Sequence, residues 1–166
     1  MAETPTDLAG AAESVATQLA PQLGIESQYI KDLSFENPLG PNAAAALRKQ
    51  PQVEVELSTA ARELSEGRYE VTIMVRGQAK VDNSAVFIAE LTYGGVFSLQ
   101  NVPSNAIKPV LLIEGPRMLF PFARNIVAEV TRDGGFPPLL INPIDFVQLY
   151  REQHMKDAVG DILGDL

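Results

Sequence analysis

The side chains of this chain that could take part in catalysis are few, and most of them are carboxylates. Glu54 and Glu56 lie two residues apart, a spacing that places both on one face of a strand, as a general acid and a general base would require. Their surroundings are rich in charge and lack the apolar enclosure that tunes a carboxyl group for proton transfer. His154, the only histidine, has no nucleophile close to it in sequence. We therefore predict no enzymatic activity.

Metal and cofactor chemistry is equally poorly supported by the residue types. The 166 residues include no cysteine and one histidine, which excludes cysteine nucleophiles, thiolate metal sites and zinc sites built from several histidines. Glycine-rich phosphate loops and the GxSxG and HExxH motifs are also missing from the sequence. The sequence therefore predicts neither a cofactor nor a metal site.

The charge of the chain indicates what kind of partner it can have. Lys and Arg number 13 against 21 Asp and Glu, giving a formal net charge of −8. Nucleic acids and anionic membranes require clustered positive charge, so a cationic partner is expected instead. No apolar run is long enough to span a bilayer, and the acidic N-terminal segment lacks the pattern of a secretory signal. We expect a cytoplasmic protein.

Four segments alternate between apolar and polar residues, which predicts strands over residues 27–36, 53–58, 69–76 and 85–96. The short connections among the last three suit antiparallel hairpins, so we expect a meander-like antiparallel sheet. The connection over residues 37–51 is long enough either to cross the sheet or to bind something. Gly94-Gly95 inside the last segment predicts a bulge or a bend.

After Pro103 the apolar period becomes helical. It predicts one helix up to Gly115-Pro116, a second over residues 116–132, and a last helix over residues 143–156 after a turn-rich loop. Strands followed by helices indicate an α+β fold, a four-stranded antiparallel sheet with helices packed on one face. The predicted organisation is a flexible N-terminal extension, a single domain and a flexible acidic tail, over residues 1–26, 27–157 and 158–166.

A sheet covered on one side leaves its other face to solvent, and the polar partners of each alternation should share that face. These residues are Asp32, Glu36, Glu54, Glu56, Glu70 and Glu90, with Arg76 and Lys80 and with the apolar Ile30, Met74 and Ile88. Alternation alone leaves two interpretations open. The face is either a solvated surface that keeps the protein in solution or a flat docking site for a basic, partly apolar segment.

Blocks of sequence between Tyr29 and Phe146 resemble the SecB family of bacterial export chaperones. They occur in the order and at the spacing of that family. They read YIKDLSFENP from Tyr29, YGGVFS from Tyr93, LFPFAR from Leu119, GFPPL from Gly135 and NPIDF from Asn142.

The resemblance implies an ATP-independent chaperone, a homotetramer built as a dimer of dimers, which holds unfolded preproteins and passes them to the SecA motor. It also implies that Asp32, Glu36, Ile88 and Glu90 contact the basic, zinc-containing C-terminal segment of SecA. All four belong to the face described above.

The resemblance further implies a client-binding groove, although each of its residues could equally be ordinary core. The candidates are Leu47, Phe97, Phe120, Phe122, Phe136, Leu140, Phe146 and Tyr150. A tryptophan of the family in the long connection is replaced here by Lys49.

Two alternatives remain beside an export chaperone. One is a SecB-like chaperone dedicated to a toxin–antitoxin pair. The other, from a different class, is a small-molecule-binding α+β domain with a pocket in the apolar loop over residues 136–141.

Overall fold

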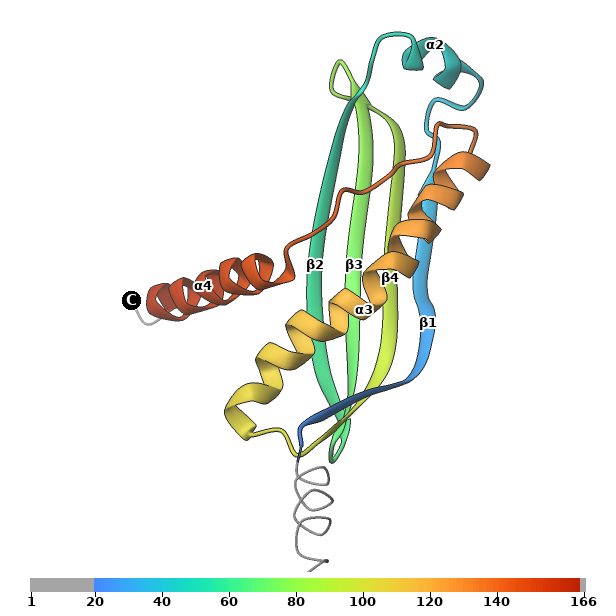
Figure 1. Ribbon diagram of the computed structural model, residues 1–166. Helices are drawn as coiled ribbons and strands as arrows, with labels where there is room; N and C mark the ends of the chain where they lie inside the picture. Colours follow the sequence, from blue (N-terminus) through green and yellow to red (C-terminus); the bar gives the residue numbers. More distant parts are fainter. Residues whose placement is uncertain (1–19, 165–166) are drawn as a thin grey trace, which may run out of the picture.

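The computed structural model describes residues 20–164, with side chains up to residue 156, and it has the predicted α+β fold (Figure 1). One four-stranded antiparallel sheet carries a long helix across one face, and a second helix leaves from the sheet edge. The elements in chain order are β1 (Gln22–Glu36), η1 (Gly40–Asn42), α2 (Ala43–Leu47), β2 (Gln52–Ser65), β3 (Arg68–Val81), β4 (Ser84–Gln100), α3 (Ser104–Asp133) and α4 (Phe146–Gly164).

The strand order β1-β4-β3-β2 differs in one respect from the predicted meander. The hairpins β2–β3 and β3–β4 are confirmed, but β1 pairs with β4 and not with β2. Residues 37–51 cross from one edge of the sheet to the other. The aromatic ring of Phe35 explains the placement of β1, because it packs against Phe87 of β4 and Phe136, with ring centroids 6.1 and 5.9 Å away.

Helix α3 is continuous, whereas the sequence predicted a break at Gly115-Pro116. Proline inside a helix removes a backbone hydrogen bond and usually kinks or ends the helix. Here tertiary packing outweighs that cost, because Gly115 and Pro116 are both buried. A Cβ atom at position 115 would lie 3.1 Å from Val71, so glycine allows the helix to approach the sheet closely.

Two boundaries also differ from the prediction. Strand β1 begins at Gln22, so residues 22–26 belong to the sheet and not to the extension predicted for residues 1–26. Helix α4 runs to Gly164 and thus includes most of the tail predicted over residues 158–166. Residues 1–19 of the predicted extension and residues 165–166 of the predicted tail lie outside the described part of the chain.

The main core lies between the sheet and α3, on what is called here the covered face. Its buried side chains include Val71, Ile73, Leu91, Phe97, Leu111, Leu119 and Val127. A second cluster, formed by Ala43, Ala79, Val86, Phe87 and Phe136, lies beneath α2. The main core uses alternate strand residues, which leaves the opposite face of the sheet, the open face, free of α3.

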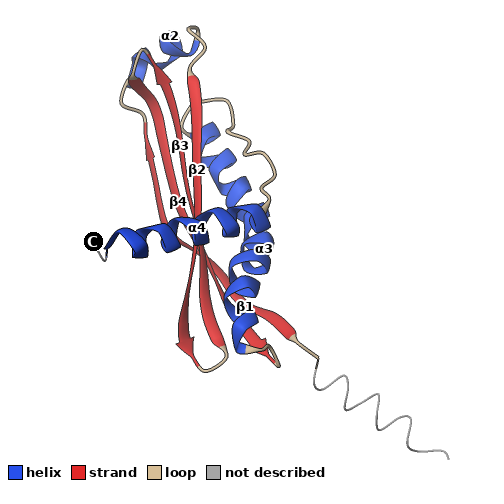
Figure 2. Ribbon diagram, turned by 90° about the vertical axis from the view of Figure 1, so that its left-hand side faces the viewer, coloured by secondary structure: helices blue, strands red, loops and turns tan. Residues whose placement is uncertain are grey.

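Helix α4 crosses the β2 edge of the sheet, as Figure 2 shows. The Thr59 hydroxyl of β2 donates a hydrogen bond of 3.0 Å to the Oε1 atom of Gln153, which ties α4 to this edge. Among the residues that the structure describes, no helix is both long and apolar enough to cross a membrane.

Candidate functional site

The pairing of the four strands places charged residues of neighbouring strands side by side on the open face. In the middle of the sheet, Arg76 of β3 lies opposite Glu56 of β2 on one side and Glu90 of β4 on the other. Arg76 forms an ion pair with Glu90. The ammonium group of Lys80 and the carboxylate of Glu54 form another pair, 3.1 Å apart. The open face therefore carries its charges as cross-strand pairs with an excess of carboxylates.

The four residues predicted to contact SecA lie together on this face. Glu36 of β1 is directly opposite Ile88 of β4, and Glu90 is opposite Ser34. Asp32 lies two residues before Ser34 in β1. It is opposite Thr92 of β4, which in turn pairs with Met74 of β3 on the open face. Because directly opposite residues of an antiparallel pair point to the same side, the placement predicted for all four is confirmed.

A hollow of about 750 Å³ covers the centre of the open face. Carboxylates outnumber cations in its lining, which includes Asp32, Glu56, Glu90 and Glu152 against Arg76 and Lys156. Met74, which is 37% exposed, and Leu149 of α4 provide apolar surface in the same hollow. An electronegative hollow with apolar surface suits a cationic segment that also carries apolar side chains.

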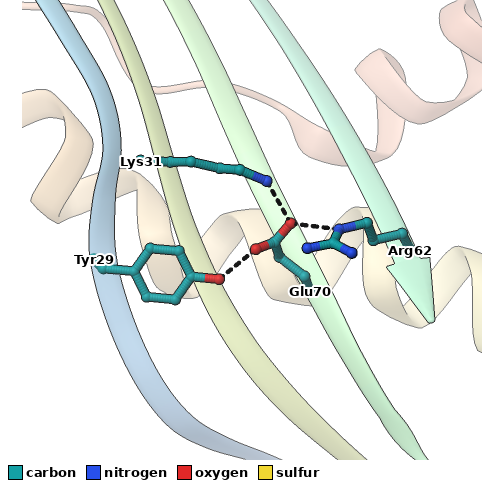
Figure 3. A network of polar contacts seen from close by, with 4 residues as sticks. All are labelled: Tyr29, Lys31, Arg62 and Glu70. Atoms are coloured by element: carbon teal, nitrogen blue, oxygen red, sulfur yellow. Dashed lines mark hydrogen bonds and ion pairs between the residues drawn. The ribbon is translucent and has the colours of Figure 1, made fainter. Parts of the chain in front are cut away.

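Beside this hollow, Glu70 of β3 is the centre of a polar network (Figure 3). Glu70 is only 5% exposed although it belongs to the open face. Its Oε1 atom accepts hydrogen bonds from Nε of Arg62 at 2.8 Å and from Nζ of Lys31 at 2.7 Å. The Tyr29 hydroxyl donates to Oε2. The network therefore links β1, β3 and β2 across the sheet.

The network shifts the protonation equilibria of its members. Hydrogen bonds from Arg62, Lys31 and Tyr29 stabilise the carboxylate and hold the pKa of Glu70 at about 2. Burial, together with the hydrogen bond to Glu70, raises the pKa of Tyr29 to about 12. At neutral pH the group consists of one carboxylate, one neutral phenol and two cations.

A β-bulge brings Tyr29 and Lys31 into this network, and here the predicted alternation is wrong. The β1–β4 register shifts between Ile30 and Asp32, so Lys31 is an additional residue in β1. Ile30, expected on the open face, pairs instead with Tyr93, whose ring stacks on Phe122 of α3. Tyr29 and Lys31, expected on the covered face, reach Glu70 on the open face.

Gly94-Gly95 has a different role from the predicted bulge. The β3–β4 register runs through both glycines without a shift, and the irregularities lie in the neighbouring strand β1. A Cβ atom at position 94 would come within 2.9 Å of the Tyr29 ring, and one at position 95 within 2.9 Å of Leu119. Gly94 therefore lets the Tyr29 ring lie against β4 on its way to Glu70, and Gly95 lets Leu119 of α3 pack closely on the sheet.

Residues proposed for the client groove are divided between the core and the surface. Phe97, Phe136 and Phe146 are buried core residues, and Phe120 packs against Phe146 with ring centroids 5.7 Å apart. Leu47 and Tyr150 are half-buried, whereas Phe122 and Leu140 are 50% and 60% exposed. Lys49, at the position of the family tryptophan, is exposed and lies 3.8 Å from the carboxylate of Asp82.

The loop considered as a small-molecule pocket contributes side chains to the core. Phe136 and Ile141, near its two ends, are 5% and 3% exposed and belong to the two hydrophobic clusters. This packing disfavours a ligand pocket inside the loop. Within the described part of the chain, no group of three or more His, Cys, Asp or Glu residues could hold a metal ion.

The sequence analysis missed Tyr29, Lys31 and Arg62 as members of a site. Arg62 lay outside the predicted strand because the alternation stops at Ser58, whereas β2 continues to Ser65. The available signal was the β2–β3 hairpin: extending its register by a few residues places Arg62 opposite Glu70.

The SecB family model, described as preprotein translocase subunit SecB, matches residues 16–157. This chain belongs to the SecB family. A relative from Azorhizobium caulinodans, protein-export protein SecB, is 50% identical over 139 residues, which are 84% of this chain and 87% of the relative. Protein-export protein SecB of Granulibacter bethesdensis is 50% identical over 159 residues, covering 89% and 93% of the two chains.

Among solved structures, the chain is similar to a SecB-like chaperone of Mycobacterium tuberculosis in complex with a ChAD peptide from the HigA1 antitoxin. The TM-score is 0.61 at 14% identity, and the match covers 80% of this chain and 95% of the other. At this identity the similarity shows the fold alone. The relatives with about half of their residues identical confirm the resemblance and identify the function as that of a protein-export chaperone of the SecB family, which binds preproteins.

Proposed function

We propose that this SecB-family chaperone delivers its preproteins to SecA by docking the basic C-terminal segment of SecA on the open face. The observation that carries the proposal is the shared position of Asp32, Glu36, Ile88 and Glu90 on two adjacent strands, beside the electronegative hollow. Carboxylates around an apolar side chain complement a segment that is basic and partly apolar. The zinc in this complex belongs to SecA.

Charge reversal on the open face tests the docking proposal. Asp32→Lys and Glu90→Lys should abolish binding of the zinc-loaded C-terminal SecA peptide in calorimetry, because each places a cation opposite a basic ligand. Asp133→Lys, at an α3 position where the side chain is 74% exposed, makes the same charge change away from this face and should leave the affinity intact. Unchanged affinity in both open-face variants would exclude docking at these residues.

We further propose that the chaperone holds its clients in the cytoplasm without ATP and without catalysis, in part through Leu140, the most exposed of the groove candidates. Leu140 is 60% exposed and lies in the loop before α4, so it can contact a client without disrupting the core. Leu140→Ser should reduce the suppression of aggregation of a refolding client. Met155→Ser, at a position that is 69% exposed on α4, is the matched control. Equal suppression by both variants would contradict this assignment.

We propose that the working particle is a homotetramer, a dimer of dimers with helices between two outer sheets. The outward side of α3 supports this arrangement, because Met118 and Phe122 are 39% and 50% exposed on a helix that would be covered in such an assembly. Light scattering at micromolar concentration should give the mass of four chains. A stable monomer would exclude the proposed arrangement.

A further inference from the structure

A second, smaller hollow adjoins the electronegative one on the open face and differs from it in charge. Its volume is about 260 Å³, and its lining includes Lys31, Arg62 and Glu70. Met74 and Thr92 line both hollows and therefore mark their common border. The side chains of Lys31 and Arg62 are 44% and 61% exposed, so their charges can act on a ligand that lies on this face.

The bulge in β1 places the ammonium group of Lys31 on the open face, directly beside the proposed docking residue Asp32. In a regular strand, neighbouring residues point to opposite faces. Here Lys31 and Asp32 are neighbours in sequence, but both side chains lie on the open face: Lys31 binds Glu70, and Asp32 lines the electronegative hollow. A repulsive cation for a basic ligand is thus fixed directly beside an attractive carboxylate.

We propose that the Lys31–Glu70–Arg62 triad is a charge boundary that limits where a basic segment lies on the open face, with Glu70 as the residue that sets its net charge. This inference rests on the proposed docking of a basic segment. Glu70 binds both cations and neutralises one of their two charges, leaving one net positive charge beyond Met74 and Thr92. A basic segment is therefore attracted to the Asp32–Glu90 side and repelled from the other.

Four forms of the full-length protein separate this electrostatic role from a structural one. Relative to the wild-type triad, Glu70→Gln adds one positive charge, Lys31→Gln removes one, and Glu70→Gln/Lys31→Gln returns the charge to its original value while breaking the network. The probe is the zinc-loaded C-terminal SecA peptide, and its affinity is measured by calorimetry at low and high salt.

The affinity should follow the local charge. Glu70→Gln should weaken binding roughly two- to fivefold at low salt and Lys31→Gln should strengthen it by a similar factor, as expected for one unit charge acting over surface distances. The double variant should regain wild-type affinity even though its network is broken. All differences should shrink at high salt because surface charges are screened.

Results other than these would contradict either the docking proposal, the charge boundary or the electrostatic role of Glu70. If wild-type protein does not bind the peptide, docking on the open face is wrong, and the boundary with it. If wild-type protein binds and the single variants bind equally well, docking stands and the boundary is wrong. If the double variant is as weak as Glu70→Gln, the role of Glu70 is structural. Should Glu70→Gln fail to fold, Arg62→Gln and Lys31→Gln carry the test, since both should tighten binding.

Discussion

Glu70→Gln is also expected to change how the stability of the protein depends on pH. Glu70 is almost fully buried, and its carboxylate accepts three hydrogen bonds that hold its pKa at about 2, against an ordinary value of 4.5. A carboxyl group whose pKa is lowered by folding stabilises the native state above pH 4.5 and loses that contribution as the pH falls toward 2. Glutamine has no such titration.

The size of the effect follows from the shift. Each pKa unit corresponds to about 1.36 kcal/mol, so the fall from 4.5 to about 2 would contribute about 3 kcal/mol. Lys31 and Arg62 are 44% and 61% exposed, and solvent screening weakens their hold on the carboxylate. We therefore expect the wild-type protein to be more stable than Glu70→Gln by about 2 kcal/mol at neutral pH, with a smaller difference in acid.

The assay is urea denaturation from neutral pH to about pH 2, at one fixed protein concentration because the proposed assembly would couple to folding. Glu66→Gln, which removes an exposed carboxylate from the turn between β2 and β3, is the matched control and should leave the free energy of unfolding close to the wild-type value. The decisive quantity is the gap between wild type and Glu70→Gln. A gap that stays constant across the acid range would refute the reasoning, because it would reflect altered packing and not the titration of Glu70.

Three further experiments test the Tyr29 phenol, the core beneath α3 and the contact between Gly134 and Phe35. A difference titration between wild type and Tyr29→Phe should show a phenol with a pKa of about 12, because burial and the hydrogen bond to Glu70 raise its pKa. The stability that this raised pKa provides is complete below pH 10 and is lost as the pH rises through 12. A titration midpoint near pH 10 would contradict this prediction. Leu119→Ala, at a fully buried position, should cost about 2–5 kcal/mol in urea denaturation, whereas Met155→Ala, at a position of α4 that is 69% exposed, should cost far less. Gly134→Ala should cost about 1–3 kcal/mol, because its Cβ would lie 2.2 Å from the Phe35 ring, and Phe35→Leu should recover part of that loss.

The sheet could be predicted from the sequence wherever one face of a strand is apolar. Val71, Ile73 and Val75 of β3 are buried on the covered face as their alternation indicated. The outer part of β2, from Thr59 to Ser65, lacks this contrast because its residues are small or charged apart from Leu64, which is 39% exposed. Its strand conformation comes from pairing with β3, which is tertiary information.

The same distinction applies to the candidate site. Asp32 and Glu36 could be placed because Leu33 and Phe35 alternate with them and orient this half of β1. Tyr29 and Lys31 could not be placed, because the bulge that reorients them depends on the pairing of two strands and leaves no mark on the local periodicity. The continuity of α3 was hidden for a related reason: its prolines argue for a break, and only the packing of Gly115 on Val71 opposes it.

The pairing of β1 with β4 also has a consequence for the synthesis of the protein. Asp32 and Glu90 come from the first and the last strand of the sheet, so the ribosome makes half of the proposed docking surface long before the other half. Until β4 emerges, β1 has no edge to join, and such non-local pairing slows folding. If SecA docks as proposed, a nascent chaperone cannot present the complete surface, and recruitment of the motor has to wait for a finished sheet.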